Sequence, residues 1–187
     1  MNRIIWHWTA GGGKANGSDR KRYAFIIEAD GTVVAGVHPP EVNAAIANPR
    51  DIATYYAHTR GANAGAISIS LAGMRRAVER PFDPGTHPIT EAQIEVLVRL
   101  TAEQCRKYKI AVTRQTVLSH AEVEPTLGIK QARKWDIMWL PGMAATGDPV
   151  EIGDALRARV IDALRPVAQP TPTWMRRLAA RLPGLAR

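Results

Sequence analysis

The pattern of apolar and polar positions predicts a chain of short strands and two long helices. Apolar runs rich in β-branched and aromatic residues indicate strands over residues 3–8, 23–28, 32–37, 65–73 and 116–120. Asp30 and Gly31 supply a turn that joins the second and third runs into a hairpin. In the fourth run, isoleucine and leucine alternate with Ser68 and Ser70, and this period predicts a half-buried strand.

Helical spacing is clearest over residues 90–108. Thr90 is suited to cap the amino end of this helix, and Gln93 completes a capping box. One face of the helix carries Ile94, Leu97, Val98, Thr101, Cys105 and Tyr108. A second amphipathic helix is predicted over residues 151–167, and the proline- and glycine-containing segment between residues 120 and 148 is predicted to be irregular.

Strands interspersed with helices predict an α/β fold, a single central mixed β-sheet flanked by helices, over residues 1–167. Residues 168–173, "AQPTPT", indicate a linker. Residues 174–187 form a basic C-terminal tail that contains arginines and no acidic residue. Its apolar residues at helical spacing make the tail amphipathic, which suits contact with an anionic membrane surface.

Charge and cysteine content narrow the classes of partner and site. The 187 residues carry a formal net charge of +8, so polyanions are the expected long-range partners. Nucleic acid is not expected, because no helix-turn-helix or RNA-recognition motif is present. The single cysteine, Cys105, excludes an internal disulfide and any zinc site built on several cysteines. The amino end shows no secretory signal, and no stretch approaches the roughly 20 apolar residues of a transmembrane helix.

The five histidines are the candidate chemistry of the chain. His38 and His87 each precede a proline and are predicted to lie in surface loops. His7 and His120 each end a predicted strand, and Asp136 follows in the irregular segment. Two imidazoles and one carboxylate with an open fourth position make a catalytic zinc site. The spacing alone does not identify such a site, and imidazoles hydrogen-bonded at strand ends are the alternative.

Five sequence segments, in order, resemble one enzyme family. They are "IIWHWTAGG", "YAFIIEADGTVVAG", "YYAHTRGANAGAISISLAG", "SHAEVEP" and "KWD". Together they are similar to the zinc-dependent N-acetylmuramoyl-L-alanine amidases of the type-2 family, which includes phage lysozyme-like amidases, muropeptide-recycling amidases and peptidoglycan recognition proteins. The resemblance covers about residues 3–142 and implies hydrolysis of the amide bond between N-acetylmuramic acid and L-alanine in peptidoglycan.

The resemblance also implies roles for individual residues. It makes His7, His120 and Asp136 the ligands of one zinc ion per chain, and Lys134 and Tyr23 catalytic residues. The motif His-x-x-Gly-x-Asn matches a substrate-groove loop, which makes its polar members substrate-binding candidates: His58, Arg60 and Asn63. Glu122 has two interpretations: it holds a ligand histidine from outside the metal's ligand shell, or it orders the loop.

Two departures from the family pattern bear on the biological role. The recycling branch carries a catalytic glutamate where this chain has Ser70, which favours the branch that uses Tyr23. The segment "TLGIKQARKW", residues 126–135, is longer than in compact members and separates Asp136 from His120.

We therefore expect a zinc amidase that acts as a phage or prophage endolysin. The enzyme is expected to be made in the cytoplasm, to act on the cell wall and to be monomeric. A cytosolic muropeptide-recycling amidase and a non-catalytic peptidoglycan-binding module are the alternatives. For the tail, with Trp174, Leu178 and Leu182 at helical spacing, contact with negatively charged peptidoglycan or no contact at all are alternatives to a membrane.

Overall fold

A five-stranded mixed β-sheet forms the centre of the protein in a computed structural model that describes residues 1–166. The strands are β1 Arg3–Trp8, β2 Phe25–Ile27, β3 Val33–Ala35, β4 Ala66–Leu71 and β5 Val117–Ser119, in the order β3-β2-β4-β1-β5. Only β3 pairs antiparallel, at one edge. The predicted α/β fold is thus confirmed. The predicted linker and basic tail, residues 168–187, lie outside the described residues.

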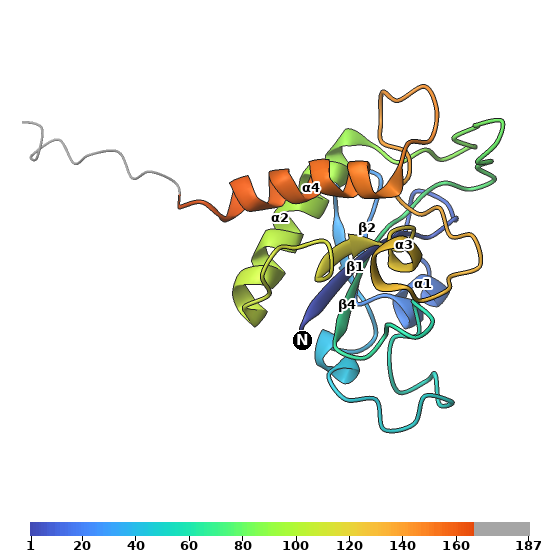
Figure 1. The fold of residues 1–187 in the computed structure, drawn as a ribbon. Coiled ribbons are helices and arrows are strands. Elements are labelled where there is room, and N and C mark those ends of the chain that lie inside the picture. Colours follow the sequence, from blue (N-terminus) through green and yellow to red (C-terminus); the bar gives the residue numbers. More distant parts are fainter. Residues whose placement is uncertain (167–187) are drawn as a thin grey trace, which may run out of the picture.

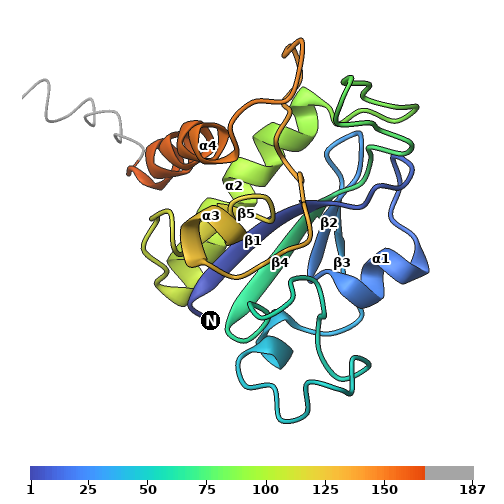
Figure 2. The same ribbon diagram turned by 45° about the vertical axis from the view of Figure 1, so that its right-hand side comes forward.

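Two long helices cover one face of this sheet (Figure 1 and Figure 2). They are α2, Glu91–Tyr108, and α4, Pro149–Leu164. The predicted capping box of α2 is present, because the Thr90 side chain accepts from the Gln93 backbone and the Gln93 side chain accepts from the Thr90 backbone. The helix predicted over residues 151–167 begins two residues earlier and ends three residues earlier, with Asp148 as its N-cap.

The alternation of side chains along β1 divides the interior in two. Ile4, Trp6 and Trp8 join the larger core under α2 and α4. Ile5 points to the opposite face, into a smaller cluster with Leu118 of β5. His7 has the same parity as Ile5, so the strand directs its imidazole to the face away from the two long helices.

Strand β4 corrects one expectation. The pattern over residues 65–73 predicts a half-buried strand, but all six residues of β4 are buried. Ser68 and Ser70 do face away from Ile67 and Ile69, as the period requires, and yet both serines are fully covered. The half-buried prediction is wrong because β4 is the middle strand of the sheet and both of its faces are packed.

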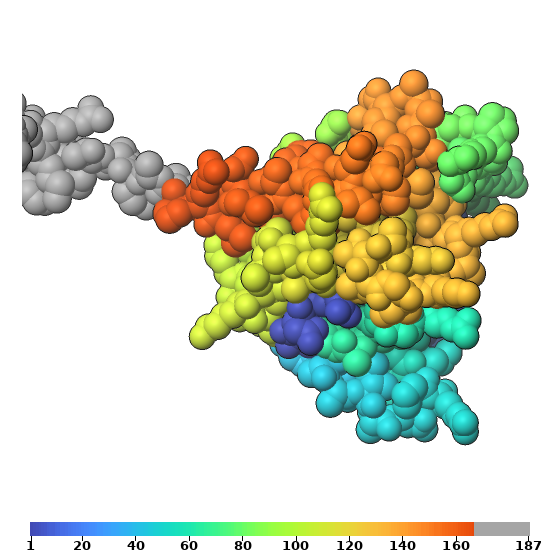
Figure 3. All heavy atoms as spheres, in the orientation of Figure 1, coloured from blue at the N-terminus to red at the C-terminus, as the bar shows by residue number. Residues whose placement is uncertain are grey.

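Three short helical elements are absent from the sequence prediction: α1 Gly17–Arg22, the 3₁₀ helix η1 Pro40–Asn43 and α3 Val123–Leu127. The last of these lies in the segment predicted to be irregular. In the space-filling view, α4 (orange) lies against the gold segment that contains α3 (Figure 3). Among the described residues, no helix is long and apolar enough to cross a membrane.

Candidate metal centre and active site

The candidate ligands meet at the carboxyl ends of neighbouring parallel strands. His7 is the second-last residue of β1, and His120 immediately follows β5. Because β1 and β5 are parallel, both residues lie at the same edge of the sheet. The His120 backbone N–H donates to the carbonyl of Trp6 at 2.9 Å, which extends the pairing by one residue. The resulting position suits a binding site, as the carboxyl ends of strands do in other α/β proteins.

Asp136 reaches the two histidines from the long loop between α3 and α4. Its Oδ1 accepts a hydrogen bond from the Trp8 backbone at 3.3 Å. Three non-glycine residues in this loop have left-handed backbone conformations: Ala132, Arg133 and Ile137. Such conformations are uncommon in proteins, and those that occur are concentrated at functional sites. They turn the chain sharply on both sides of Asp136.

The distances between ligand atoms fit one small cation. His7 Nδ1 lies 3.9 Å from Asp136 Oδ1, and His120 Nδ1 lies 3.7 Å from Asp136 Oδ2. One ligand atom of each residue lies within 4.8 Å of the others. In a tetrahedral zinc site with bonds of about 2.0–2.2 Å, ligand atoms are roughly 3.3–3.6 Å apart. A small inward movement therefore brings the three groups to ligand distance.

Burial determines the protonation of this cluster. All three residues are buried. Desolvation holds the pKa of His7 well below its usual value, and the neighbouring His120 and His58 lower it further. Desolvation also lowers the pKa of His120, although the Asp136 carboxylate opposes this, and it raises the pKa of Asp136 against the effect of His120. Neutral imidazoles are the form that binds a metal ion.

A cavity of about 410 Å³ opens beside the cluster and is lined by both His120 and Asp136. Tyr23 lines it too, with its ring centroid 5.3 Å from that of His7. Burial first, and the Asp136 carboxylate second, raise the pKa of Tyr23 above its usual range, so its hydroxyl stays protonated. Lys134 is exposed at the cavity and brings a positive charge to it.

The loop of the His-x-x-Gly-x-Asn motif lines a second cavity, of about 360 Å³, which shares His120 and Lys134 with the first. Arg60 is exposed there. Asn63 lines the cavity, and its side-chain oxygen accepts from the backbone N–H groups of His58 and Thr59 at 3.0 and 2.7 Å. His58 is buried, and its Nδ1 lies 3.0 Å from His7 Nε2.

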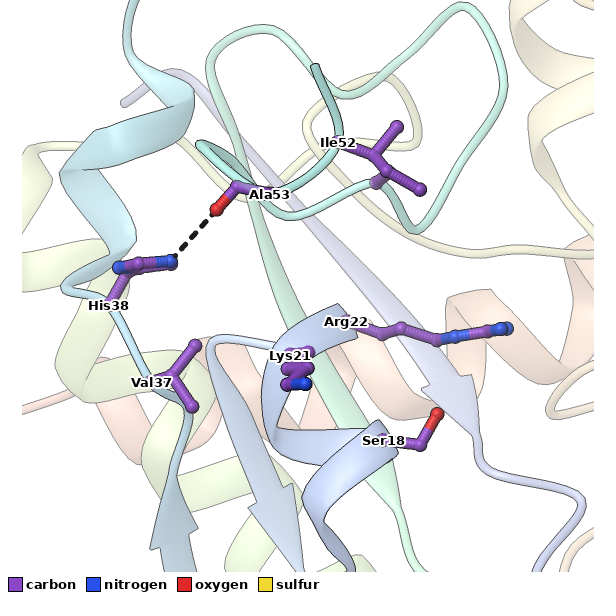
Figure 4. A pocket seen from close by; sticks show the side chains of 8 residues that line it. Ser18, Lys21, Arg22, Val37, His38, Ile52 and Ala53 are labelled. Atoms are coloured by element: carbon purple, nitrogen blue, oxygen red, sulfur yellow. Dashed lines mark hydrogen bonds between the residues drawn. The ribbon is translucent and has the colours of Figure 1, made fainter. Parts of the chain in front are cut away.

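A third cavity, of about 680 Å³, adjoins the first through Arg22 and Ala57 (Figure 4). Lys21 and Arg22 from α1 form its basic side. His38 lies on the opposite side, where its Nε2 is 3.2 Å from the carbonyl of Ala53. His38 is thus half-buried against a cavity, while His87 is exposed as predicted.

Glu122 contacts the turn before His120 rather than the His120 ring. Its Oε2 accepts from the Ser119 backbone at 2.7 Å, and its Oε1 accepts from Arg157 at 2.7 Å. These are the contacts of a residue that orders the loop, one of its two interpretations.

Two residues at the site escaped the sequence analysis. The side-chain oxygen of Gln131 lies 2.9 Å from His120 Nε2, and Arg157 of α4 is buried against Glu122. Gln131 stands in an aperiodic segment and gives no signal. Arg157 does give one, because the helical spacing places it on the same face as Gly153 and Val160, where an arginine is unexpected.

A family model described as N-acetylmuramoyl-L-alanine amidase matches residues 1–142. No curated protein sequence matches the chain. Among solved structures, the chain is similar to the N-acetylmuramoyl-L-alanine amidase LysC from Clostridium intestinale URNW, with 20% identity, coverage of 82% of this chain and 83% of that chain, and a TM-score of 0.47. It is also similar to the endolysin amidase LysCS from the same organism, with 18% identity, coverage of 69% and 84%, and a TM-score of 0.41.

Proposed function

The chain belongs to the N-acetylmuramoyl-L-alanine amidase family, and from that premise we propose that it hydrolyses its substrate with one zinc ion bound by His7, His120 and Asp136. The enzyme cleaves the amide bond between N-acetylmuramic acid and L-alanine in peptidoglycan. The observation that carries the zinc proposal is the convergence of three buried ligand atoms, from three separate segments, within 4.8 Å.

The donor set suits the chemistry that the reaction needs. An unactivated amide resists attack by neutral water. Zinc held by His7, His120 and Asp136 would supply Lewis acidity, which would lower the pKa of water to roughly 7 and polarise the scissile carbonyl. With two neutral imidazoles and one carboxylate as ligands, the zinc centre would keep a net charge of about +1, and this charge would preserve its Lewis acidity.

Tyr23 and Lys134 are proposed to act on the reacting carbonyl from the cavity side. The protonated Tyr23 hydroxyl donates a hydrogen bond to the carbonyl oxygen or to the attacking water and orients it. The Lys134 ammonium stabilises the negative charge that develops on that oxygen. A fixed cation has a stronger effect in a partly enclosed cavity than in bulk water. Arg60, beside Lys134 in the second cavity, is proposed to bind the substrate.

We propose that the enzyme acts as an endolysin on the intact cell wall. The three adjoining cavities provide a surface large enough for a polymer, and the basic side chains of Lys21 and Arg22 suit a substrate with carboxylates. Ser70 pairs in register with His7, at the strand position where the resemblance puts the glutamate of recycling amidases.

The remaining features of the chain fit this role. One chain contributes all three ligands, which supports action as a monomer with a catalytic domain over residues 1–167. The charge of residues 174–187 supports the proposal that the tail contacts an anionic envelope surface.

The test is a digest of purified sacculi by zinc-loaded protein, analysed by mass spectrometry. We expect free stem peptides beginning with L-alanine beside intact glycan strands, and none after chelation or in the variant His120→Ala. The matched control is His87→Ala, which removes an exposed histidine and should release as much peptide as the unmodified protein.

Each alternative has its own outcome. New reducing sugar ends would indicate a glycosidase. Release from soluble muropeptides alone would support the recycling role. Retention on the sacculi without products would favour the binding module.

A further inference from the structure

We infer that His58 and Gln131 are positioning residues, each of which accepts a hydrogen bond from Nε2 of one ligand histidine and thereby leaves Nδ1 free for the metal. The inference rests on the proposed zinc site. It gives a physical role to His58 that differs from substrate binding, and it assigns a role to Gln131, which lies in the segment that is longer than in compact family members.

The first pair is formed by His7 and His58. His7 Nδ1 faces Asp136, and His7 Nε2 lies 3.0 Å from His58 Nδ1 with the two rings nearly perpendicular. A neutral imidazole that binds a metal through one nitrogen carries its proton on the other, so His7 Nε2–H is the donor and His58 Nδ1 the acceptor. Thr59 Oγ1, at 3.4 Å, is a second acceptor for the same proton.

The second pair is formed by His120 and Gln131. Gln131 Oε1 lies 2.9 Å from His120 Nε2. The orientation of this amide is fixed, because its Nε2 donates to the carbonyls of Arg60 at 2.8 Å and Ile129 at 3.2 Å. The oxygen must then face His120, and since it can only accept, His120 Nε2 must carry the proton. His120 Nδ1 is left unprotonated beside Asp136.

One loop supports both pairs. His58 supplies its ring to His7, and the carbonyl of Arg60, two residues later, anchors the Gln131 amide. Asn63 closes the loop by accepting from the backbone of His58, and its own carbonyl accepts from the buried Asn43 side chain at 3.0 Å. Residues 58–63 therefore form a hydrogen-bonded loop that supports both ligand histidines, His7 directly and His120 through Gln131.

This arrangement explains why the histidine at position 58 is buried rather than exposed to solvent. His58 and Gln131 are both less than a tenth exposed. Burial excludes water as a competing partner for the ligand histidines, so the orientation of both rings is set before the metal arrives. Hydrogen-bond partners of metal ligands usually contribute about 10- to 100-fold to metal affinity or activity.

The test measures zinc affinity by competition with a chromophoric chelator. His58→Phe and Gln131→Met remove the acceptors, and we expect each to raise the zinc Kd about 10- to 100-fold. His58→Asn retains an acceptor oxygen near the position of His58 Nδ1, and we expect it to recover most of the affinity that His58→Phe loses. His87→Phe and Gln115→Met make the same changes at exposed positions and should leave the Kd unchanged.

Two further readouts separate positioning from folding. The visible spectrum of the Co²⁺-substituted protein reports ligand geometry, and we expect it to change in His58→Phe and Gln131→Met but not in the control variants. The melting temperature of the metal-free proteins shows whether each variant folds.

The possible results distinguish this inference from the proposed metal centre. If the unmodified protein binds zinc, and His58→Phe and Gln131→Met bind it equally well, the inference is overturned and the metal centre stands. Equal losses in His58→Asn and His58→Phe would also overturn it. Failure of the unmodified protein to bind zinc would overturn both.

Discussion

At the scale of single residues, a substitution at Tyr23 tests the proposed catalytic role separately from metal binding. Tyr23 lines the cavity beside Asp136, and its raised pKa keeps it a hydrogen-bond donor at neutral pH. Tyr23→Phe keeps the ring against His7 and removes only the hydroxyl. We expect kcat on soluble muropeptides to fall by about 100-fold, the usual cost of losing one donor to a developing negative charge. The zinc Kd should not change. An unaltered kcat would remove Tyr23 from the mechanism.

The sequence resemblance identified the residues that meet at the site, but not the contacts that orient them. His7, His120 and Asp136 lie together in the structure, as the resemblance implies. Gln131 could not be predicted, because its contact with His120 depends on the path of an aperiodic loop through left-handed residues. The path of such a loop cannot be predicted from strand periodicity or residue spacing.

At the scale of elements, helix α4 lies beyond the matched residues 1–142 and yet braces the turn that carries His120. Arg157 donates to Glu122 at 2.7 Å and to the carbonyl of Val117 in β5 at 2.9 Å, and both charged side chains are buried. Burial raises the pKa of Glu122, and the Arg157 guanidinium opposes that shift. The ion pair therefore joins α4 to the edge of the sheet at the candidate metal centre.

Removing one partner of this pair should destabilise the fold strongly. Arg157→Met leaves the Glu122 carboxylate buried and unpaired, and we expect it to cost about 3–5 kcal/mol of unfolding free energy. Arg159→Met, on the same helix, breaks only a partly exposed pair with Glu95 and should cost about 1 kcal/mol or less. Urea unfolding measures both. Similar losses in the two variants would contradict a structural role for the buried pair.

A glycine in α4 offers an independent check of the same contact. Replacing glycine by alanine within a helix normally stabilises it by about 1 kcal/mol. A Cβ on Gly153, however, would lie 2.2 Å from the Glu122 carboxylate. The same urea series should therefore show Gly153→Ala to be destabilising, the opposite of the normal sign.

Helices were predicted correctly from the sequence where they are long enough for the helical spacing of apolar residues to repeat. The 18 residues of α2 and its capping box follow from spacing and cap chemistry alone. Helices α1 and α3 have 6 and 5 residues, too few for a helical period to show. The burial of Ser68 and Ser70 could not be predicted either, because a strand's place in the sheet is decided by pairings with distant segments.

At the scale of the whole molecule, the buried histidines should make the metal-free protein sensitive to acid. Burial lowers the pKa of His7 and His120, and it lowers that of His58 to about 3. In unfolded chains these groups titrate near pH 6.5. Between the two values the unfolded state binds more protons, so the stability they contribute is complete above about pH 6.5 and is lost as the pH falls. Asp136, whose pKa is raised, opposes this trend.

A difference measurement isolates one histidine from the others. We expect the unfolding free energy of the chelated protein to fall from about pH 7.5 to pH 5.5, and His58→Asn to reduce the slope by up to about 1.4 kcal/mol per pH unit, the limit for one proton. His87→Asn should keep the original slope, because that histidine is exposed. Urea unfolding at several pH values gives the slopes. An unchanged slope in His58→Asn would mean that His58 becomes protonated as readily in the folded protein as in the unfolded chain. The burial of His58 against His7 should prevent this.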